Sequence, residues 1–444
     1  MNDRQLRCSR RRFLAQAAAM TLAGGLPGTS AARVLESSQN FRARPPIPNH
    51  DGRRPIAAVT TVYRPMSHAY HIAGRFIRGY PRDSQFHIPK HFVRSMYVDQ
   101  IPDNDLSREE AQIYDMKLAK TIDETLTDGK NNLAVDGVLL IGEHGNYKRN
   151  EKGQILYPRY EWMEQIVAAF RRTGQVVPVF CDKHLSFSWT KAKQMYDWSK
   201  ELHIPFMAGS SLPVTWRRPE LELPLGSTVR DALVATYGPI EVYGFHALET
   251  LQCMVERRKG GETGIKAVTC LTGNSVWKAG DEGRWSWELL EAALGRSETL
   301  NPGDVRRNVG HPVMTFPAIP PTVFLVEYRD GLRGTVLLLN GHIQDFCFAA
   351  RVNGESKPAS CLFYLPLPPG AKFFDPLTAN IEKFLESGKL PYPVERTLLT
   401  SGALDAAMES HYRKGARVET PELGISYKAP EDSGFFHGSP ANPV

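Results

Sequence analysis

The sequence lacks the glycine-rich turn that usually follows the first strand of a dinucleotide-binding domain. Residues 56–62 are rich in β-branched side chains and predict a buried strand, and residues 68–77 predict a short helix after it. The turn between them, residues 60–67, contains no glycine. Glycines in such a turn let the backbone approach a pyrophosphate closely. This absence argues against an ordinary pyrophosphate-binding loop at the start of the domain.

Three further absences narrow the class of protein. No segment after the N-terminal region reaches the length of a transmembrane helix, so an integral membrane protein is not expected. No basic run carries interleaved aromatic residues, so nucleic acid is not expected as a partner. The cysteine spacings match no disulfide framework or zinc motif, which predicts mostly buried free thiols. Beyond the N-terminal region the cysteines are Cys181, Cys253, Cys270, Cys347 and Cys361.

The N-terminal region has the features of an export signal. The run from Ser9 to Leu14 contains three consecutive arginines and resembles the twin-arginine export motif. A weakly apolar stretch follows at residues 15–26, and small residues at 30–32 suit a signal peptidase. We therefore expect a twin-arginine signal peptide over residues 1–32, a polar linker over residues 33–54, and a periplasmic or otherwise exported protein. Because this route moves folded proteins, it fits a cofactor loaded before export.

Strands and helices alternate over the next part of the chain. After the first strand, strand patterns occupy residues 94–99, 133–142, 176–184 and 205–211, and helix patterns occupy residues 106–130, 160–174 and 188–203. Ser107 and Glu110 have the spacing of a capping box at the start of the long helix. Alternation of this kind implies right-handed crossovers and a parallel sheet. We predict a Rossmann-like doubly wound α/β domain over residues 55–213.

After Pro213 the alternation stops, and strands dominate from residue 266. Helical patterns return at residues 378–387 and 401–413. This order predicts an α+β domain with a largely antiparallel open sheet over residues 214–428, through which we expect the chain to form a homo-oligomer. The final residues, 429–444, are rich in glycine, proline and serine and predict a disordered tail.

Polar residues follow several predicted strands at their carboxyl ends, where open α/β sheets bind ligands. Glu143 and His144 follow the third strand between two glycines, and Asp182-Lys183-His184 follows the fourth. A charged pair at such a position favours a ligand-facing role for Glu143 and His144. His68 and His71 share one helix face, but two histidines alone are weak evidence for a metal site.

Two segments resemble the glucose–fructose oxidoreductase/inositol dehydrogenase/MocA family. Residues 177–219 look like the family's Glu-Lys-Pro region, with Asp182-Lys183-His184 at that motif. Residues 238–249 look like its Gly-x-His segment, with His246 at the histidine. The resemblance spans nearly the whole chain after the linker and implies two domains, Rossmann-like and then α+β. The sequence departs from the family at the glycine-rich fingerprint and at Val242, where the family has an aspartate. It also departs at Asp99, which follows Tyr63 by about 36 residues, whereas the usual spacing of the ribose-binding acidic residue is about 20.

The resemblance implies an oxidoreductase that acts on a sugar, cyclitol or related polyol with NAD or NADP. Lys183 would bind substrate hydroxyls, His246 would take the hydroxyl proton, and Glu241 would stand in for the missing aspartate. The other residues assigned on this basis are Arg64, Ser67, Asp99, Glu143 and His144 for the cofactor, and His184 and Arg217 for the substrate.

The missing glycines leave two alternatives open. One is a cofactor-free or metal-assisted carbohydrate lyase, isomerase or hydrolase on the same scaffold, with the charged and histidine residues at the strand ends as acid–base groups. The other is a non-catalytic carbohydrate-binding protein. At the turn itself, either a dinucleotide is displaced outward and Arg64 contacts its phosphates, or no dinucleotide binds.

Overall fold

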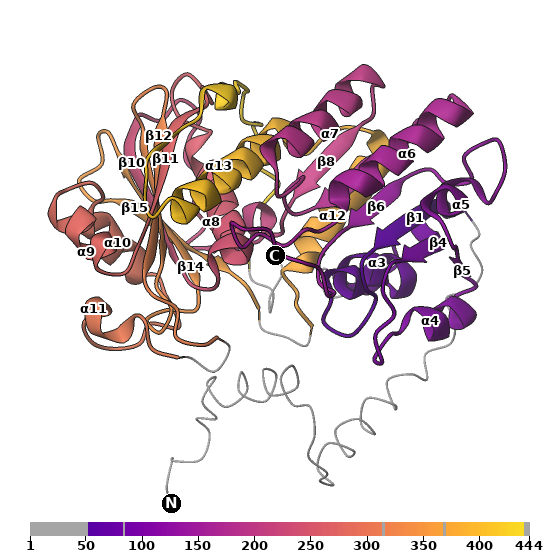
Figure 1. The fold of residues 1–444 in the computed structure, drawn as a ribbon, viewed down its shortest axis with the longest axis horizontal. Coiled ribbons are helices and arrows are strands. Elements are labelled where there is room, and N and C mark those ends of the chain that lie inside the picture. Colours follow the sequence, from indigo (N-terminus) through magenta and orange to yellow (C-terminus); the bar gives the residue numbers. More distant parts are fainter. Residues whose placement is uncertain (1–51, 83–84, 313–315, 367–369, 439–444) are drawn as a thin grey trace, which may run out of the picture.

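The computed structural model describes residues 52–82, 85–312, 316–366 and 370–438. They form two sheets that lie beside one another, each with helices packed on it (Figure 1). The predicted signal peptide, and the predicted linker up to residue 51, lie outside the described residues. Within the described ranges, no helix combines the length and apolar character needed to cross a membrane.

The first sheet is parallel throughout, as the alternation predicts. Its strands are β1 (Arg54–Thr60), β4 (His91–Val98), β5 (Lys117–Leu118), β6 (Val138–Ile141), β7 (Val179–Asp182) and β8 (Phe206–Gly209). Their order across the sheet is β5-β4-β1-β6-β7-β8, so β1 lies between β4 and β6. A small hairpin of β2 (Tyr80–Arg82) and β3 (Gln85–His87) lies outside this sheet. The Rossmann-like doubly wound prediction is confirmed.

Helices cover both faces of this sheet because its strands are apolar on both sides. One face packs on α5 (Ile122–Thr127), α6 (Arg159–Thr173) and α7 (Trp189–Glu201). The other packs on α3 (His68–Arg78) and α12 (Phe374–Ser387). Helix α12 belongs by sequence to the second domain, so the chain returns to the first sheet after completing the second.

The second sheet is mixed and mostly antiparallel, as predicted. Its strands are β9 (Trp216–Arg218), β10 (Val229–Thr236), β11 (Ile265–Thr272), β12 (Thr322–Tyr328), β13 (Arg333–Leu338), β14 (Phe346–Val352), β15 (Ala359–Tyr364) and β16 (Val418–Glu419). Their order is β16-β11-β12-β13-β10-β14-β15-β9, and β10 and β13 are the parallel pair. Helices α8 (Ile240–Val255) and α13 (Val394–Tyr412) cover the face towards the first sheet (Figure 1).

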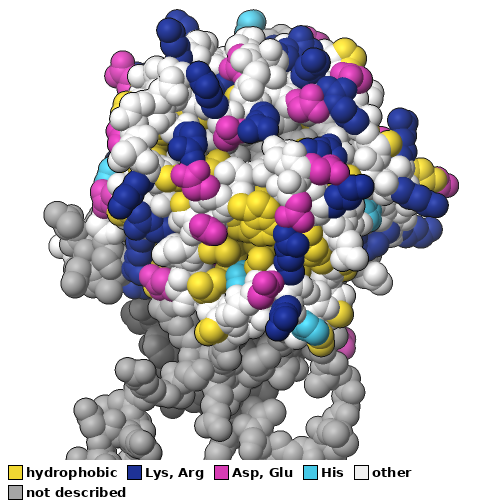
Figure 2. Space-filling view, turned by 90° about the vertical axis from the view of Figure 1, so that its left-hand side faces the viewer, with side chains coloured by type: hydrophobic (Ala, Val, Ile, Leu, Met, Phe, Trp, Pro, Cys, Tyr) yellow, Lys and Arg dark blue, Asp and Glu magenta, His cyan; other side chains and the backbone are white. Residues whose placement is uncertain are grey.

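Short helices cover the opposite face of the second sheet. They are α9 (Asn274–Asp281), α10 (Trp287–Leu294) and, at the edge, α11 (Val305–Asn308). Trp277, Trp285 and Leu290 of this layer are buried against strand residues such as Leu337. Figure 2 shows this side, where apolar side chains gather at the centre of a charged surface. The homo-oligomer remains a prediction. A second copy of the chain that bound to this face of the second sheet would contact these helices as well as the strands.

The prediction of one long helix over residues 106–130 is wrong. The structure has α4 (Ser107–Ile113), then strand β5, then α5, because Asp115 takes a left-handed conformation at φ 49° and Thr121 caps a new helix. The capping box is also wrong: Ser107 donates a hydrogen bond to Asp105, and the cap residue of α4 is Leu106. The carboxylate of Glu110 is used elsewhere, as described below.

Disorder throughout the tail is also wrong, because residues 429–438 are anchored to the second domain. Arg257 donates hydrogen bonds to the carbonyl oxygens of Pro430 and Glu431, and the Phe436 amide donates to the Val214 carbonyl oxygen. Two short 3-10 helices, Leu212–Val214 and Pro421–Leu423, complete the described elements. The buried guanidinium of Arg257 is a hydrogen-bond donor for this polar segment, and the composition of the segment does not reveal it.

Candidate functional site

Charged side chains meet where β6 and β7 end. Lys183 Nζ donates to Glu143 Oε1 at 2.8 Å, and Arg159 Nη2 donates to Glu143 Oε2 at 2.7 Å. All three side chains are at most 5% exposed. We call the group around them the strand-end cluster; its members are His68, Glu143, His144, Arg159, Asp182, Lys183 and His184.

Two residues of the cluster have a strained backbone. Lys183 has φ 66° and His144 has φ 69°, in the left-handed region that favours glycine. A side chain there costs roughly 1 kcal/mol or more. The surrounding structure holds both residues in place: the Lys183 amide donates to the Gly209 carbonyl oxygen, and the His144 amide donates to the Tyr157 hydroxyl. Strain of this kind gathers at functional sites.

Contacts within the cluster determine the protonation states of Glu143 and His184. Burial raises the pKa of Glu143, but the neighbouring Lys183 and Arg159 lower it more, so the pKa lies well below the usual range and the group is ionised. Burial, and then Arg159, hold the pKa of His184 well below its ordinary value. His184 is therefore neutral, and its Nε2 lies 3.1 Å from Arg159 Nη1, which can only donate.

A histidine and an aspartate form a second close pair beside this ion pair. His68, the first residue of α3, places its Nδ1 2.6 Å from Asp182 Oδ2. The Asp182 side chain is 1% exposed and that of His68 is 16% exposed. The His68 ring also packs against the rings of His144 and Phe374, with centroids 5.2 Å and 5.1 Å away. This pair joins the helix after β1 to the end of β7.

Several buried polar atoms around the cluster have no hydrogen-bond partner among the described residues. They are His144 Nε2, Arg159 Nε, Asp182 Oδ1, His184 Nδ1 and His246 Nδ1. Buried polar groups in native proteins are nearly always paired, and each exception calls for an explanation. Oxygen and nitrogen atoms of this kind fit the hydroxyl groups of a small polar ligand. The cluster therefore has hydrogen-bonding capacity that its own contacts do not use.

His246 approaches the cluster from the second domain. It lies on α8, in ring contact with Tyr243 and Phe346. Burial holds its pKa well below the ordinary value, and the charge of Lys183 lowers it further. The imidazole is therefore neutral, which is the protonation state that a general base needs before it takes a proton. The structure brings His246 within the electrostatic influence of Lys183, although the two residues are not hydrogen-bonded.

Glu241 lies on the first turn of α8 and is held by a neighbouring loop. Its carboxylate accepts a hydrogen bond from the Ile155 amide at 2.7 Å and from Arg149 Nη1 at 3.4 Å. Burial raises its pKa to about 7. These contacts leave Glu241 without a bond to His246 among the described residues, so its assignment as a replacement for the family's aspartate stays a prediction.

The glycine-free turn is built around a buried tyrosine. The Tyr63 hydroxyl donates to Glu110 at 2.6 Å and accepts from Arg78 at 2.8 Å, beneath α3. The residue of the turn in the left-handed region is Met66, at φ 65°. The Ser67 hydroxyl oxygen caps α3 by accepting from the Tyr70 amide.

The remaining assigned residues lie in three different settings. Arg64, in the turn, is half-buried and donates to the carbonyl oxygen of its neighbour Pro65. Asp99 is exposed after β4 and accepts from the hydroxyls of Tyr97 and Tyr147. Arg217 is buried apart from the cluster, where it donates to backbone oxygens and to Ser433. A substrate role for Arg217 would require it to leave these partners.

Sequence reasoning missed Arg159 and the role of His68. Arg159 begins α6 and is 1% exposed, yet nothing in the sequence around it distinguishes it from a surface arginine. The sequence pairs His68 with His71 on one helix face, and both rings do contact Phe374. The partner of His68 that the sequence does not reveal is Asp182. No group of three or more potential metal ligands occurs in the described part of the chain.

Solved structures of oxidoreductases share this fold. GenD2 from gentamicin A biosynthesis, solved in complex with NAD, is 15% identical at a TM-score of 0.52, over 84% of this chain and 98% of that one. A probable dehydrogenase from Thermotoga maritima is 13% identical at 0.50, over 83% and 99%. An oxidoreductase from Agrobacterium radiobacter, solved with NAD+, L-tartaric acid and magnesium, is 12% identical at 0.50, over 84% and 99%.

The chain has the two-domain fold of these oxidoreductases. The fold implied by the family resemblance is thus confirmed. No protein-family model matches the sequence, and no curated protein matches it. The likeness therefore establishes the architecture, and the chemistry has to be argued from the strand-end cluster.

Proposed function

We propose that this protein is an oxidoreductase that oxidises or reduces a hydroxyl-bearing carbon of a sugar, cyclitol or related polyol with a nicotinamide cofactor. The observation that carries the proposal is Lys183, a buried cation held by Glu143 in a strained conformation at the carboxyl end of β7. On this fold, ligands bind at that edge of the sheet. GenD2, which shares the fold, was solved with NAD.

The residues that act on the substrate follow from their protonation states. Neutral His246 accepts the proton of a substrate hydroxyl, and the Lys183 cation stabilises the negative charge that develops on the oxygen. Ionised Glu143 keeps the lysine in position. Unpaired Asp182 Oδ1 and His184 Nδ1 suit neighbouring hydroxyl groups, which favours a polyhydroxylated substrate.

Residues near α3 suit the cofactor in part. The N-terminus of α3 attracts anions, and Arg64 adds a positive charge beside it, so these two would hold phosphates. Asp99 follows β4, where an acidic residue holds a ribose in this fold. A bound nicotinamide supplies the hydride acceptor. The bulky turn does not suit the close approach of a pyrophosphate to the backbone, so the phosphates would lie farther out than in a glycine-loop protein.

One observation favours a second candidate, a cofactor-free enzyme that acts on carbohydrate. The bond between His68 and Asp182 reaches from α3 to β7 across the end of β6, which lies between β1 and β7. A dinucleotide crosses this edge of the sheet in related folds. In the cofactor-free enzyme, these side chains would serve as acid–base groups at the same place.

Calorimetry with NAD and NADP on ligand-stripped protein separates the two candidates. The oxidoreductase should bind one of them with a dissociation constant near the micromolar range, and Arg64→Ala should weaken binding by about tenfold through loss of a charged phosphate contact. Arg171→Ala, on the exposed part of α6, is the control and should leave binding unchanged. If the folded protein binds neither nucleotide at millimolar concentration, the oxidoreductase proposal is contradicted and the cofactor-free enzyme takes its place.

We also propose export by the twin-arginine route. The supporting residues, Arg10 and Arg11, lie in the N-terminal region outside the described residues. Changing both to lysine should leave the precursor in the cytoplasm, as measured by cell fractionation. Normal export of the double variant would contradict the proposal.

A further inference from the structure

The pair of His68 and Asp182 differs from the other histidine–carboxylate pairs of the described chain. His87 pairs with Glu382 at 2.7 Å and His437 pairs with Glu220 at 2.9 Å, with 29% and 65% of the histidine side chains exposed. Asp182 is the most buried of the three carboxylates, at 1%, and its bond to His68 is the shortest, at 2.6 Å. It also lies next to Lys183 in the strand-end cluster.

The bond fixes the orientation of the imidazole. A carboxylate only accepts, so the proton of neutral His68 lies on Nδ1 and the other nitrogen, Nε2, is left as a base. Nε2 has no hydrogen-bond partner among the described residues, and the side chain keeps 16% of its surface accessible. A buried aspartate that orients a histidine in this way is the arrangement that makes histidine an effective general base.

Unpaired atoms next to the pair supply contacts for a ligand. Asp182 Oδ1 is buried and accepts no hydrogen bond from the described residues, although a buried carboxylate oxygen needs a donor. His144 Nε2 is likewise buried and unpaired, in the ring that packs on His68. Asp182 Oδ1, His144 Nε2 and the free His68 Nε2 thus lie close together. Such a set of atoms suits a ligand with adjacent hydroxyl groups better than it suits an apolar or anionic ligand.

We propose that His68 and Asp182 form an acid–base dyad that exchanges a proton with a hydroxyl group of a polyhydroxylated ligand. His68 Nε2 takes the hydroxyl proton and becomes an imidazolium, the oxygen becomes an alkoxide, and Asp182 balances the new charge. The proton returns to the oxygen in the reverse step, so no further reactant is consumed. The dyad is separate from His246 and does not depend on a nicotinamide cofactor.

The reactivity of His68 towards diethyl pyrocarbonate tests the dyad without substrate or cofactor. Ethoxyformylation rates of individual histidines are measured by peptide mass spectrometry in the wild type, Asp182→Asn and Glu220→Gln. Asp182→Asn should slow modification of His68 by about three- to tenfold, because the Asp182 carboxylate keeps the proton on Nδ1 and leaves Nε2 free to react, whereas an asparagine amide can donate to Nδ1 and move the proton to Nε2. In the control, Glu220→Gln should change the rate at exposed His437 by less than about twofold.

Two results would overturn the dyad. One is a His68 that is unreactive in the wild type, and the other is an unchanged His68 rate in folded Asp182→Asn. If that variant does not fold, long-range nitrogen–proton NMR on the wild type decides instead. It should show neutral His68 with its proton on Nδ1, and a proton on Nε2 would refute the assignment. Because neither measurement involves nucleotide, failure here is distinct from failure of the proposed oxidoreductase.

Discussion

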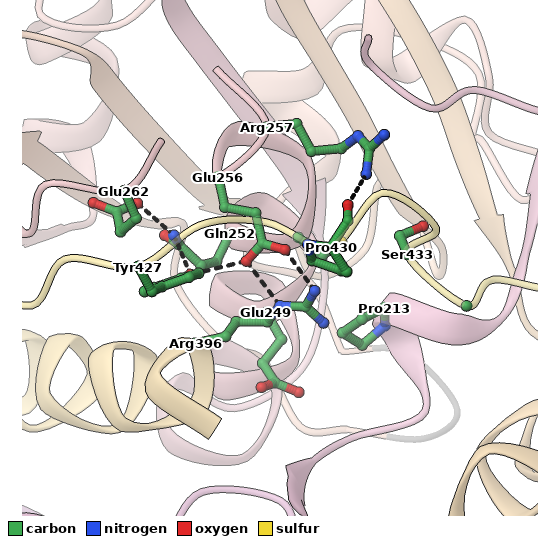
Figure 3. Close-up of polar contacts among 12 residues, drawn as sticks. Pro213, Glu249, Gln252, Glu256, Arg257, Glu262, Arg396, Tyr427, Pro430 and Ser433 are labelled. Atoms are coloured by element: carbon green, nitrogen blue, oxygen red, sulfur yellow. Dashed lines mark hydrogen bonds and ion pairs between the residues drawn. The ribbon is translucent and has the colours of Figure 1, made fainter. Parts of the chain in front are cut away.

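Two buried polar groups in this protein differ in how fully they are paired. Figure 3 shows the α8 network, formed by Gln252, Glu256, Glu262, Arg396 and Tyr427. Glu256 accepts from Arg396 at 2.9 and 2.5 Å and from Tyr427 at 2.8 Å, while Gln252 donates to both Glu262 and Tyr427. Within the described chain, Arg396 Nη1 is the one buried atom of this network without a partner.

The strand-end cluster has four unpaired buried side-chain atoms, one each on His144, Arg159, Asp182 and His184, with a fifth on His246 nearby, and two strained residues. The α8 network joins α8 to α13 and to the C-terminal segment, so its pairing serves stability. The difference indicates how to interpret a buried set of charged side chains. Such a set is structural when its polar atoms are hydrogen-bonded to one another, and it is a candidate binding site when several of them have no partner. Glu249 also lies on α8 and accepts hydrogen bonds from the Ser210 amide and the Thr397 hydroxyl.

The largest expected effect comes from breaking the α8 network. Arg396→Met leaves Glu256 without its cation, and both side chains are 0% exposed. Removing one partner of such a pair costs about 3–5 kcal/mol of the free energy of unfolding. Urea unfolding measures it. The matched control is Arg417→Met, which breaks an exposed pair with Glu327 and should cost less than about 1 kcal/mol; equal losses in the two variants would contradict the prediction.

The next effect concerns pH. Burial raises the pKa of Glu249 to about 7, above its value of about 4.3 in the unfolded chain. Between these values the folded state holds a proton that the unfolded state has released, so stability falls as pH rises through this window. In Glu249→Gln the side chain is neutral at every pH. The decrease in the free energy of unfolding across this pH window should therefore be smaller than in the wild type by about 1–3 kcal/mol. Glu241, whose pKa is also raised to about 7, still contributes to the pH dependence of the free energy of unfolding in this variant.

Unfolding free energies at several pH values between about 4.5 and 7 measure this slope. The control is Glu164→Gln at an exposed position of α6, which should leave the slope as it is in the wild type. A slope in Glu249→Gln as steep as in the wild type would show that Glu249 titrates normally. The contacts of Glu249 with Ser210 and Thr397 would then be those of a carboxylate at every pH in the range.

The smallest effect separates strain from ion pairing in the strand-end cluster. Lys183→Gly and Lys183→Ala both remove the hydrogen bond from Lys183 to Glu143. In both variants Glu143 keeps its hydrogen bond from Arg159. At φ 66° glycine avoids the strain of a side chain, so the glycine variant should be more stable than the alanine variant by about 1 kcal/mol. At Lys193, within α7, the order should reverse by about 1 kcal/mol. Alanine being the more stable at both positions would remove the argument from strain.

Local sequence determined much of the fold. The apolar runs and helical periodicities specify alternating strands and helices, Ser67 caps α3, and Gly174 ends α6 in the left-handed conformation. The same alternation places Glu143 and Lys183 at the ends of neighbouring strands, so their meeting follows from the parallel order of β6 and β7. These features depend on residues close together in the chain, or on the regular geometry of a parallel sheet.

Tertiary structure alone decided the partners. His68 meets Asp182 across 114 positions, Arg75 of α3 binds Asp375 of α12 across 300, and Arg257 anchors a tail whose composition predicts disorder. The segment 106–130 has helical periodicity throughout, yet β5 forms within it because β4 offers an edge to pair with. A side chain's partner depends on which elements pack against it, and a polar residue has the same local sequence signal whether it is solvated, paired or left free for a ligand.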